Sequence, residues 1–224
     1  MFYRTKSGLT LTKQSTIWKH YCVMAAMMMM LGFAVYGNVK QYLYAQTYED
    51  IIKDKDQRIE VVTDERDEAR LNLKRRIDKI KTAATAIRGR YPHVPTQRAM
   101  LIADLEITYS RKENLGAHYG FGISGRESGF DPKAVSYNGT SFGLKQVHYN
   151  VWKKEIPGLT MKCLMDIECN TKTGYRILAI YRDRNGGNMH SALMSYYGAT
   201  NRDENIKYAD RVFALAMYFK PRIG

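Results

Sequence analysis

The chain has 224 residues, of which 45% are hydrophobic, and its formal net charge is +13. This length allows one large domain, or one medium-sized domain with additional segments. The basic balance favours an anionic partner, namely a membrane surface, a nucleic acid or an acidic cell-wall polymer, and charge alone does not choose among them.

Residues 21–39, "YCVMAAMMMMLGFAVYGNV", contain no Asp, Glu, Lys or Arg. A helix of this length reaches roughly the 30 Å of a bilayer core, so we predict a transmembrane helix here. Residues 1–20 carry only basic charges, which predicts a cytoplasmic N-terminus and export of everything after the helix. Two alternatives are a buried core helix and a cleaved signal peptide with its site near residues 35–37.

Residues 40–88 contain no Gly and no Pro and are rich in charged residues, Ala and Leu, which predicts a long helical stalk. A heptad seam can be drawn from Ala45 to Ile80, but several of its positions are charged. Self-association of the stalk and a solvated single helix therefore both stay open. Gly89, Pro92 and Pro95 predict a linker at 89–96.

From Thr96 onward the chain returns to helical patterns in short pieces, with no alternating run long enough to predict a strand. Four segments are expected to be helical, and they are "TQRAMLIADLEITYS", "TKTGYRILAIYRDR", "MHSALMSYYG" and "NIKYADRVFALAMYFK". We therefore predict a mostly α domain that is long enough to bury its own core.

Several familiar site types find little support in this sequence. The five histidines show no paired ligand spacing, so we expect neither a metal site nor a cofactor. Aromatic and basic residues occur together in "YRILAIYRDR", but at helical spacing they indicate a core face and a solvated face rather than nucleic-acid binding. Cys163 and Cys169 are six residues apart, a spacing that does not place them on one helix face, which leaves two separate thiols or a disulfide across a short loop as alternatives.

Glu127 has a setting suited to acid catalysis. It follows a run of glycines, which allow a ligand to approach closely, and precedes Phe130 and Pro132, so we expect it near the end of a helix. Glycoside cleavage needs a carboxylic acid that stays protonated near neutral pH beside the scissile bond, and apolar surroundings achieve this by raising its pKa. Glu127 is therefore our candidate acid.

The residues around Glu127 carry a specific resemblance. "ESGFDPKAVS" at 127–136, Asn138-Gly139 and "GLKQV" at 143–147 resemble the signature of the soluble-lytic-transglycosylase (SLT) family, whose domain is similar to goose-type lysozyme. Three later segments also resemble family segments, at 170–183, 191–199 and 208–212. The resemblance covers most of residues 97–219 and implies a mostly α, lysozyme-like domain.

The resemblance also implies roles for individual residues. Glu127 would be the catalytic acid and then the base. Five other residues would bind substrate or support the cleft: Ser128 and Ser136 would line the site or orient the acid, Gln146 would contact the saccharide or Glu127, Tyr196 would support the cleft, and Tyr208 would hydrogen-bond near the Glu127 carboxyl. Two positions depart from the family pattern, with Lys145 where Met is usual and Tyr197 where Asn is usual.

A single acid is unusual for glycoside cleavage, because ordinary retaining and inverting enzymes use two carboxylates. Within the signature the only other acid is Asp131, and nothing marks it as a partner. The resemblance implies that one Glu suffices, with the N-acetyl group and the C6 hydroxyl of the sugar replacing the second carboxylate and the water. It predicts a peptidoglycan lytic transglycosylase that cleaves the bond between N-acetylmuramic acid (MurNAc) and N-acetylglucosamine (GlcNAc) and leaves 1,6-anhydro ends.

Two other functions fit the same sequence. One is a muramidase on the same fold, which would use water; the other is a wall-penetrating structural component of a phage particle or an envelope-spanning apparatus. In each case we expect a single-pass membrane protein, cellular or in a virion, whose domain at 97–224 is periplasmic or extracellular. Export would also favour a disulfide between Cys163 and Cys169.

Overall fold

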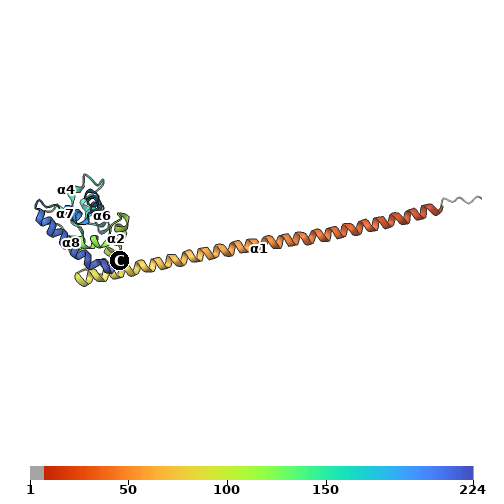
Figure 1. Ribbon diagram of the computed structural model, residues 1–224, viewed down its shortest axis with the longest axis horizontal. Helices are drawn as coiled ribbons and strands as arrows, with labels where there is room; N and C mark the ends of the chain where they lie inside the picture. Colours follow the sequence, from red (N-terminus) through yellow and green to blue (C-terminus); the bar gives the residue numbers. More distant parts are fainter. Residues whose placement is uncertain (1–7, 224) are drawn as a thin grey trace, which may run out of the picture. The chain divides into compact units, whose positions relative to one another are not determined.

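The computed structural model describes the backbone of residues 8–223 and the side chains of residues 17–223. Residues 1–7 of the predicted basic N-terminal segment lie outside this range. The elements follow in the order α1 (Gly8–Arg90), α2 (Thr96–Lys112), α3 (Ala117–Glu127), β1 (Ser141–Phe142), β2 (Val147–His148), α4 (Tyr149–Trp152), α5 (Met161–Leu164), α6 (Ile167–Arg184), α7 (Met189–Tyr197) and α8 (Arg202–Ile223) (Figure 1). The chain divides into two units, Met1–Ala69 and Arg70–Gly224.

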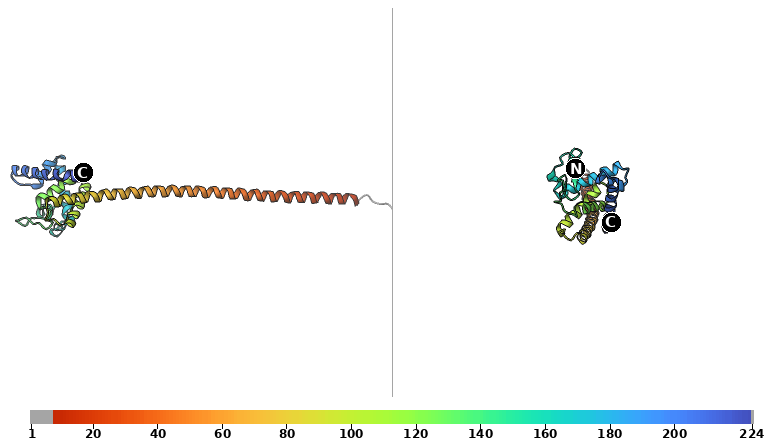
Figure 2. Two further views of the ribbon diagram at one scale, coloured as in Figure 1. Left: turned by 90° about the horizontal axis from the view of Figure 1, so that it is seen from below. Right: turned by 90° about the vertical axis from the view of Figure 1, so that its left-hand side faces the viewer.

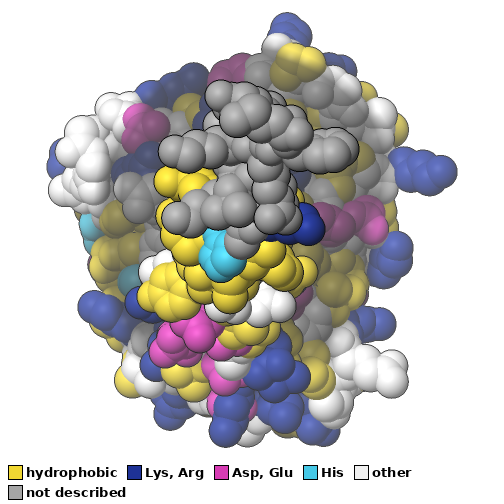
Figure 3. Space-filling view, turned by 90° about the vertical axis from the view of Figure 1, so that its right-hand side faces the viewer, with side chains coloured by type: hydrophobic (Ala, Val, Ile, Leu, Met, Phe, Trp, Pro, Cys, Tyr) yellow, Lys and Arg dark blue, Asp and Glu magenta, His cyan; other side chains and the backbone are white. Residues whose placement is uncertain are grey.

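The first unit contains the N-terminal part of α1, and its described side chains are almost all exposed. The predicted membrane segment and the predicted stalk are parts of one continuous helix, because nothing between residues 38 and 88 breaks it. Large apolar side chains such as Met28 and Phe33 are 73% and 76% exposed. Figure 3 looks onto the N-terminal end of α1 and shows hydrophobic side chains gathered around it.

Among the described residues, α1 is the one helix that is long and apolar enough to cross a membrane, with a stretch of mean hydropathy 1.7 that is not buried against the protein. An exposed apolar surface of this kind is stable in a bilayer and unfavourable in water. The apolar residues 21–39, which we predict to cross the membrane, thus lie on a helix with the required length.

The second unit begins within α1, at Arg70, earlier than the domain start at 97 that the sequence suggests. The reason is that Ala83, Ala84 and Ile87 recur at helical spacing and are buried, with Phe121 and Phe219 in the same apolar cluster. The last turns of the helix that we assigned to the stalk are therefore part of the core of the globular unit. The chain leaves α1 after Arg90, at the Pro-containing segment predicted to be a linker.

Helices surround the core of the second unit. α3 packs against α8 and α2, α7 packs against α6 and α8, and α2 packs against α6 (Figure 2). The four segments that we expect to be helical correspond to α2, α6, α7 and α8, except that Gly198, the last residue of the third segment, caps α7. Two of these helices begin at a side-chain cap, since Asp166 accepts from the Cys169 N–H and Asn188 accepts from the Ser191 N–H. The unit is mostly α, as predicted.

The sequence predicts neither the small antiparallel sheet nor the short helices α4 and α5. β1 and β2 pair Ser141 with His148 and Phe142 with Val147, and an isolated bridge joins Val135 to Phe142. Each strand has two residues, which is too short to produce a recognisable alternation of polar and apolar residues. The sheet folds the segment after Glu127 back on itself and so forms one wall of the cavity described next.

Candidate active site

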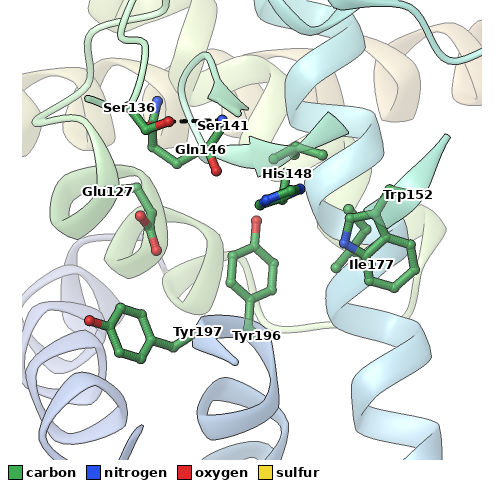
Figure 4. A pocket seen from close by; sticks show the side chains of 10 residues that line it. Glu127, Ser136, Ser141, Gln146, His148, Trp152, Ile177, Tyr196 and Tyr197 are labelled. Carbon is green, nitrogen blue, oxygen red and sulfur yellow. Dashed lines mark hydrogen bonds between the residues drawn. The ribbon is translucent and has the colours of Figure 1, made fainter. Parts of the chain in front are cut away.

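A cavity of about 240 Å³ lies in the second unit, beside the end of α3 (Figure 4). Its walls come from α3, from the loop and sheet that follow, and from α4, α6 and α7. The side chains that line it are those of Glu127, Ser136, Ser141, Gln146, Val147, His148, Trp152, Ile177, Tyr196 and Tyr197. Of the described residues in this lining, Glu127 is the one carboxylate.

Glu127 is the last residue of α3, as the sequence predicts, and its side chain is partly buried. Burial away from water raises the pKa of the Glu127 carboxyl to about 7, against the opposing influence of the hydrogen bond from Tyr208 and of the positive charges of Arg126 and Lys145. A carboxyl with this pKa is substantially protonated near neutral pH and can also release its proton there. Glu127 can therefore act first as an acid and then as a base.

Tyr208, on α8, donates a hydrogen bond from its hydroxyl to Oε1 of Glu127. Its ring stacks on that of Tyr197, with centroids 4.6 Å apart and planes 12° apart. Burial, followed by the nearby Glu127 carboxyl, raises the pKa of Tyr208 well above its usual value. The phenol consequently stays protonated and serves as a fixed donor that orients the Glu127 carboxyl.

Tyr196, on α7, lines the cavity and donates a hydrogen bond to the carbonyl oxygen of Lys145, at 3.0 Å. Its ring meets that of Tyr181 edge-on. In Figure 4 its hydroxyl lies between Gln146 and His148. Tyr196 thus joins α7 to the loop that carries the family signature, and its role in supporting the cleft stays a prediction.

Gln146 lines the cavity, but its amide nitrogen is occupied by the loop itself. Nε2 donates to the carbonyl oxygens of Ala134 and Gly143, each at 3.0 Å. Within the part of the chain that the structure describes, no hydrogen bond joins the Gln146 side chain to Glu127. Of the two contacts expected for Gln146, the one with a saccharide stays a prediction.

The two predicted serines differ in position. The Ser136 hydroxyl lines the cavity, donates to Asn138 at 2.7 Å, and accepts from the backbone N–H groups of Thr140 and Ser141. Ser128 does not belong to the cavity lining; its hydroxyl donates to the Leu144 carbonyl at 2.7 Å and so ties the end of α3 to the signature loop. Both serines thus shape the loop rather than contact the Glu127 carboxyl.

Sequence reasoning missed several residues of the cavity, chiefly His148, Trp152 and Ile177. The Nδ1 atom of His148 is buried and has no hydrogen-bond partner among the described residues. No short motif links these three residues, because they come from β2, α4 and α6. Tyr197 was noticed only as a departure from the family pattern, and its stacking on Tyr208 gives it a structural place at the site.

Cys163 and Cys169 are paired as a disulfide with their Cα atoms 5.5 Å apart. They join α5 to the first turn of α6, next to the Asn170 side chain, which donates to the carbonyls of Phe142 and Leu164.

Among the described residues no group of three or more His, Cys, Asp or Glu side chains is placed to hold a metal ion.

Comparison with known proteins bears on the same part of the chain. Residues 104–214 match the family model described as Transglycosylase SLT domain. No curated protein matches the chain. Among the matching solved structures is an X-ray structure of an inactive mutant of the lytic transglycosylase Slt from Pseudomonas aeruginosa, with 20% sequence identity and a TM-score of 0.46. That match covers 52% of this chain and 23% of the Slt chain. The family model thus identifies residues 104–214 as a Transglycosylase SLT domain.

Proposed function

We propose that this protein is a peptidoglycan lytic transglycosylase in which Glu127 is the single catalytic carboxylate. The observation that carries the proposal is the setting of Glu127, which is the one carboxylate among the described lining residues, accepts a hydrogen bond from Tyr208, and has a pKa raised to about 7 by burial. A neutral acid beside a cavity is what protonation of a glycosidic oxygen requires.

In the proposed reaction Glu127 gives its proton to the oxygen that links MurNAc to GlcNAc. The bond between C1 of MurNAc and this oxygen breaks, and GlcNAc leaves with a free hydroxyl group. The N-acetyl group of MurNAc stabilises the positive charge that develops at C1. The Glu127 carboxylate then accepts the proton of the C6 hydroxyl, and this oxygen bonds to C1. The products are a 1,6-anhydro end and a regenerated acid, with no water consumed.

Tyr208 and Tyr196 have supporting roles in this scheme. The Tyr208 phenol holds Oε1, which leaves Oε2 of the Glu127 carboxyl for the substrate. Tyr196 fixes the backbone at Lys145, and therefore the adjacent Gln146, at the cavity wall. Because catalytic groups must be held within a fraction of an ångström of their working positions, such contacts matter for rate as well as for stability.

A muramidase reaction differs only in its second half, where water would replace the C6 hydroxyl. Inverting hydrolases need a second carboxylate that activates this water. Asp131, the nearest candidate in the sequence, accepts a hydrogen bond from the backbone of Lys133 on an exposed loop and does not line the cavity. The lining therefore favours the intramolecular reaction.

The decisive experiment is mass spectrometry of murein digested by the full-length protein in detergent. From the wild type we expect fragments that are one water lighter than fragments with reducing ends. From Glu127→Gln we expect no fragments. Glu155→Gln is a matched control, because Glu155 is an exposed glutamate paired with Arg184 outside the cavity. Fragments with reducing ends would indicate a muramidase, and full activity of E127Q would contradict the proposal altogether. If E127Q abolished cleavage while the biological role persisted, the domain would act as a structural component.

We further propose that residues 21–39 anchor the protein in a membrane with residues 1–20 in the cytoplasm and the catalytic domain outside. A disulfide between Cys163 and Cys169 agrees with this topology, because such bonds persist in oxidising compartments. Before reduction, an alkylating reagent should label only Cys22 in denatured protein isolated from cells. Labelling of all three cysteines without reduction would contradict export of the domain.

Residues 40–69 are proposed to hold the domain at a distance from the membrane. Nearly all of their side chains are exposed, which is compatible with a solvated single helix and with pairing of two copies. Chemical cross-linking of the full-length protein in detergent, compared with a chain that begins at Arg70, measures whether this segment self-associates.

A further inference from the structure

An ion pair is buried beneath the candidate active site. Lys145 and Glu106 have side chains that are 1% and 0% exposed, and Nζ of Lys145 lies 2.8 Å from Oε1 and 3.0 Å from Oε2 of Glu106. Removing two charges from water is unfavourable unless they are paired and their remaining hydrogen-bonding groups are satisfied. A buried pair in the core of a small domain therefore calls for a reason beyond stability.

The Lys145 ammonium also makes hydrogen bonds to residues of α3. Besides the Glu106 carboxylate, Nζ of Lys145 contacts the Gly120 carbonyl and the Ser124 hydroxyl, each at 3.0 Å. Ser124 in turn donates to Oε1 of Glu106 at 2.7 Å. Gly120 and Ser124 lie about two turns and one turn before Glu127 on the same helix. The ammonium group thus joins α2 to the part of α3 that delivers Glu127.

The backbone of Lys145 is fixed as well. Its N–H donates to Oδ1 of Asn170 on α6 at 2.8 Å, and its carbonyl accepts from Tyr196 on α7. One residue therefore holds α2, α3, α6 and α7 around the end of the signature loop. The next residue in the chain, Gln146, lines the cavity.

The fold makes room for this pair. A Cβ atom at Gly174 would collide with the Lys145 side chain, and a Cβ atom at Gly120 would collide with the Glu106 carboxylate and the Tyr175 hydroxyl. The Lys145 ammonium also lies over the Tyr175 ring, 4.8 Å from its centroid. The methionine that is usual at position 145 in the family would leave the buried Glu106 carboxylate without its cation, so Glu106 and Lys145 belong together.

We propose that Glu106 and Lys145 form a positioning pair that fixes the end of α3 carrying Glu127 and keeps a positive charge behind the Glu127 carboxyl. This proposal rests on the role proposed for Glu127. Glu106 and Lys145 do not line the cavity, so they act through Glu127 rather than on the substrate.

Besides burial, three groups act on the pKa of Glu127: Tyr208 on α8, Arg126 on the same helix, and Lys145. His148, Tyr196 and Tyr197 line the same cavity from β2 and α7. The Lys145 ammonium lowers the pKa of Glu127, in opposition to the larger effect of burial. Loss of this ammonium therefore raises the pKa of Glu127.

The test compares the wild type with the double variant Glu106→Gln/Lys145→Met, as full-length proteins in detergent. The double variant replaces the ion pair by neutral groups of similar size, an exchange that many proteins tolerate. The proposed acid must be protonated, so activity falls as the pH rises through the pKa of Glu127. We expect this alkaline limb of kcat/KM to move upward by about half a pH unit or more.

Ile123→Val is the matched structural control, because Ile123 is buried on α3 between Gly120 and Ser124 and carries no charge. This variant should lower the melting temperature without moving the alkaline limb. An unmoved or lowered limb in the folded double variant, or an equal shift in I123V, would overturn the proposal.

A second measurement does not depend on activity. Infrared difference spectroscopy, with the spectrum of E127Q subtracted, follows the protonated carboxyl band of Glu127 as the pH is raised. The band should persist to higher pH in the double variant than in the wild type. If E127Q cleaves murein normally, the proposed function fails while this titration still tests the pair; if E127Q is inactive and the titration does not move upward, only the pair proposal fails.

Discussion

Glu106 and Glu127 are two glutamates in the same helical unit, and their surroundings differ in one decisive way. Glu106 is fully buried and paired with an ammonium group, whereas Glu127 lies at a cavity and accepts a hydrogen bond from a phenol. An ammonium partner supplies a full opposite charge, but a phenol supplies only a dipole. The comparison teaches that an opposite charge offsets the cost of burying a carboxylate at Glu106, whereas at Glu127 the effect of burial outweighs the phenol and raises the pKa of the carboxyl.

Breaking the pair on one side should have the largest effect on stability. Lys145→Met leaves the Glu106 carboxylate buried without its cation, and removal of one member of a buried pair lowers the free energy of unfolding by about 3–5 kcal/mol. The double variant Glu106→Gln/Lys145→Met should recover most of this loss. Urea denaturation of the single and double variants measures the difference, and equal stabilities for the two would mean that the ion pair contributes nothing beyond packing.

The two glutamates also differ in how far the sequence predicts them. Glu127 lies in a contiguous signature, so local sequence identifies both the residue and its place at a helix end. Glu106 and Lys145 are 39 residues apart, and each resembles a surface residue when taken alone. Their pairing depends on how α2, α3 and the signature loop meet, and no local pattern records this.

The same distinction applies to the fold. Helical periodicity and caps place α2, α6, α7 and α8, because these signals are local. The sequence alone assigns the last turns of α1 to the stalk, since charged residues dominate their composition. Only tertiary packing shows that Ala83 and Ile87 face the core, where a few small apolar residues at helical spacing suffice.

Glu127 itself should destabilise the folded protein above neutral pH. Its pKa is raised from 4.5 to about 7 on folding. The stability that the protein has below pH 4.5, where Glu127 is neutral in both states, is therefore lost as the pH rises through 7. We expect Glu127→Gln to increase the free energy of unfolding at pH 8 by about 1–3 kcal/mol, and to change it little at pH 4.

Thermal or urea unfolding at the two pH values measures this effect. Glu168→Gln is the control, because Glu168 also accepts a hydrogen bond from a tyrosine but is exposed. A gain in E127Q that is the same at pH 4 and pH 8 would show that Glu127 does not become charged in a buried site.

The smallest expected effect sharpens the role of the phenol. Tyr208→Phe removes the donor to Glu127 but keeps the ring that stacks on Tyr197. Because this hydrogen bond lowers the pKa of Glu127, its loss should move the alkaline limb of kcat/KM to higher pH. The freed carboxyl should also lose orientation, and we expect kcat to fall about 10-fold, which corresponds to about 1.4 kcal/mol. Tyr109→Phe is the matched control, since the Tyr109 hydroxyl donates to Glu168 at 2.7 Å, away from the cavity. A fall in kcat with no upward movement of the limb would assign Tyr208 to packing alone. The hydrogen bond from the phenol would then have no effect on the pKa of Glu127, and of the two partners only the ammonium at Glu106 would act electrostatically on its glutamate.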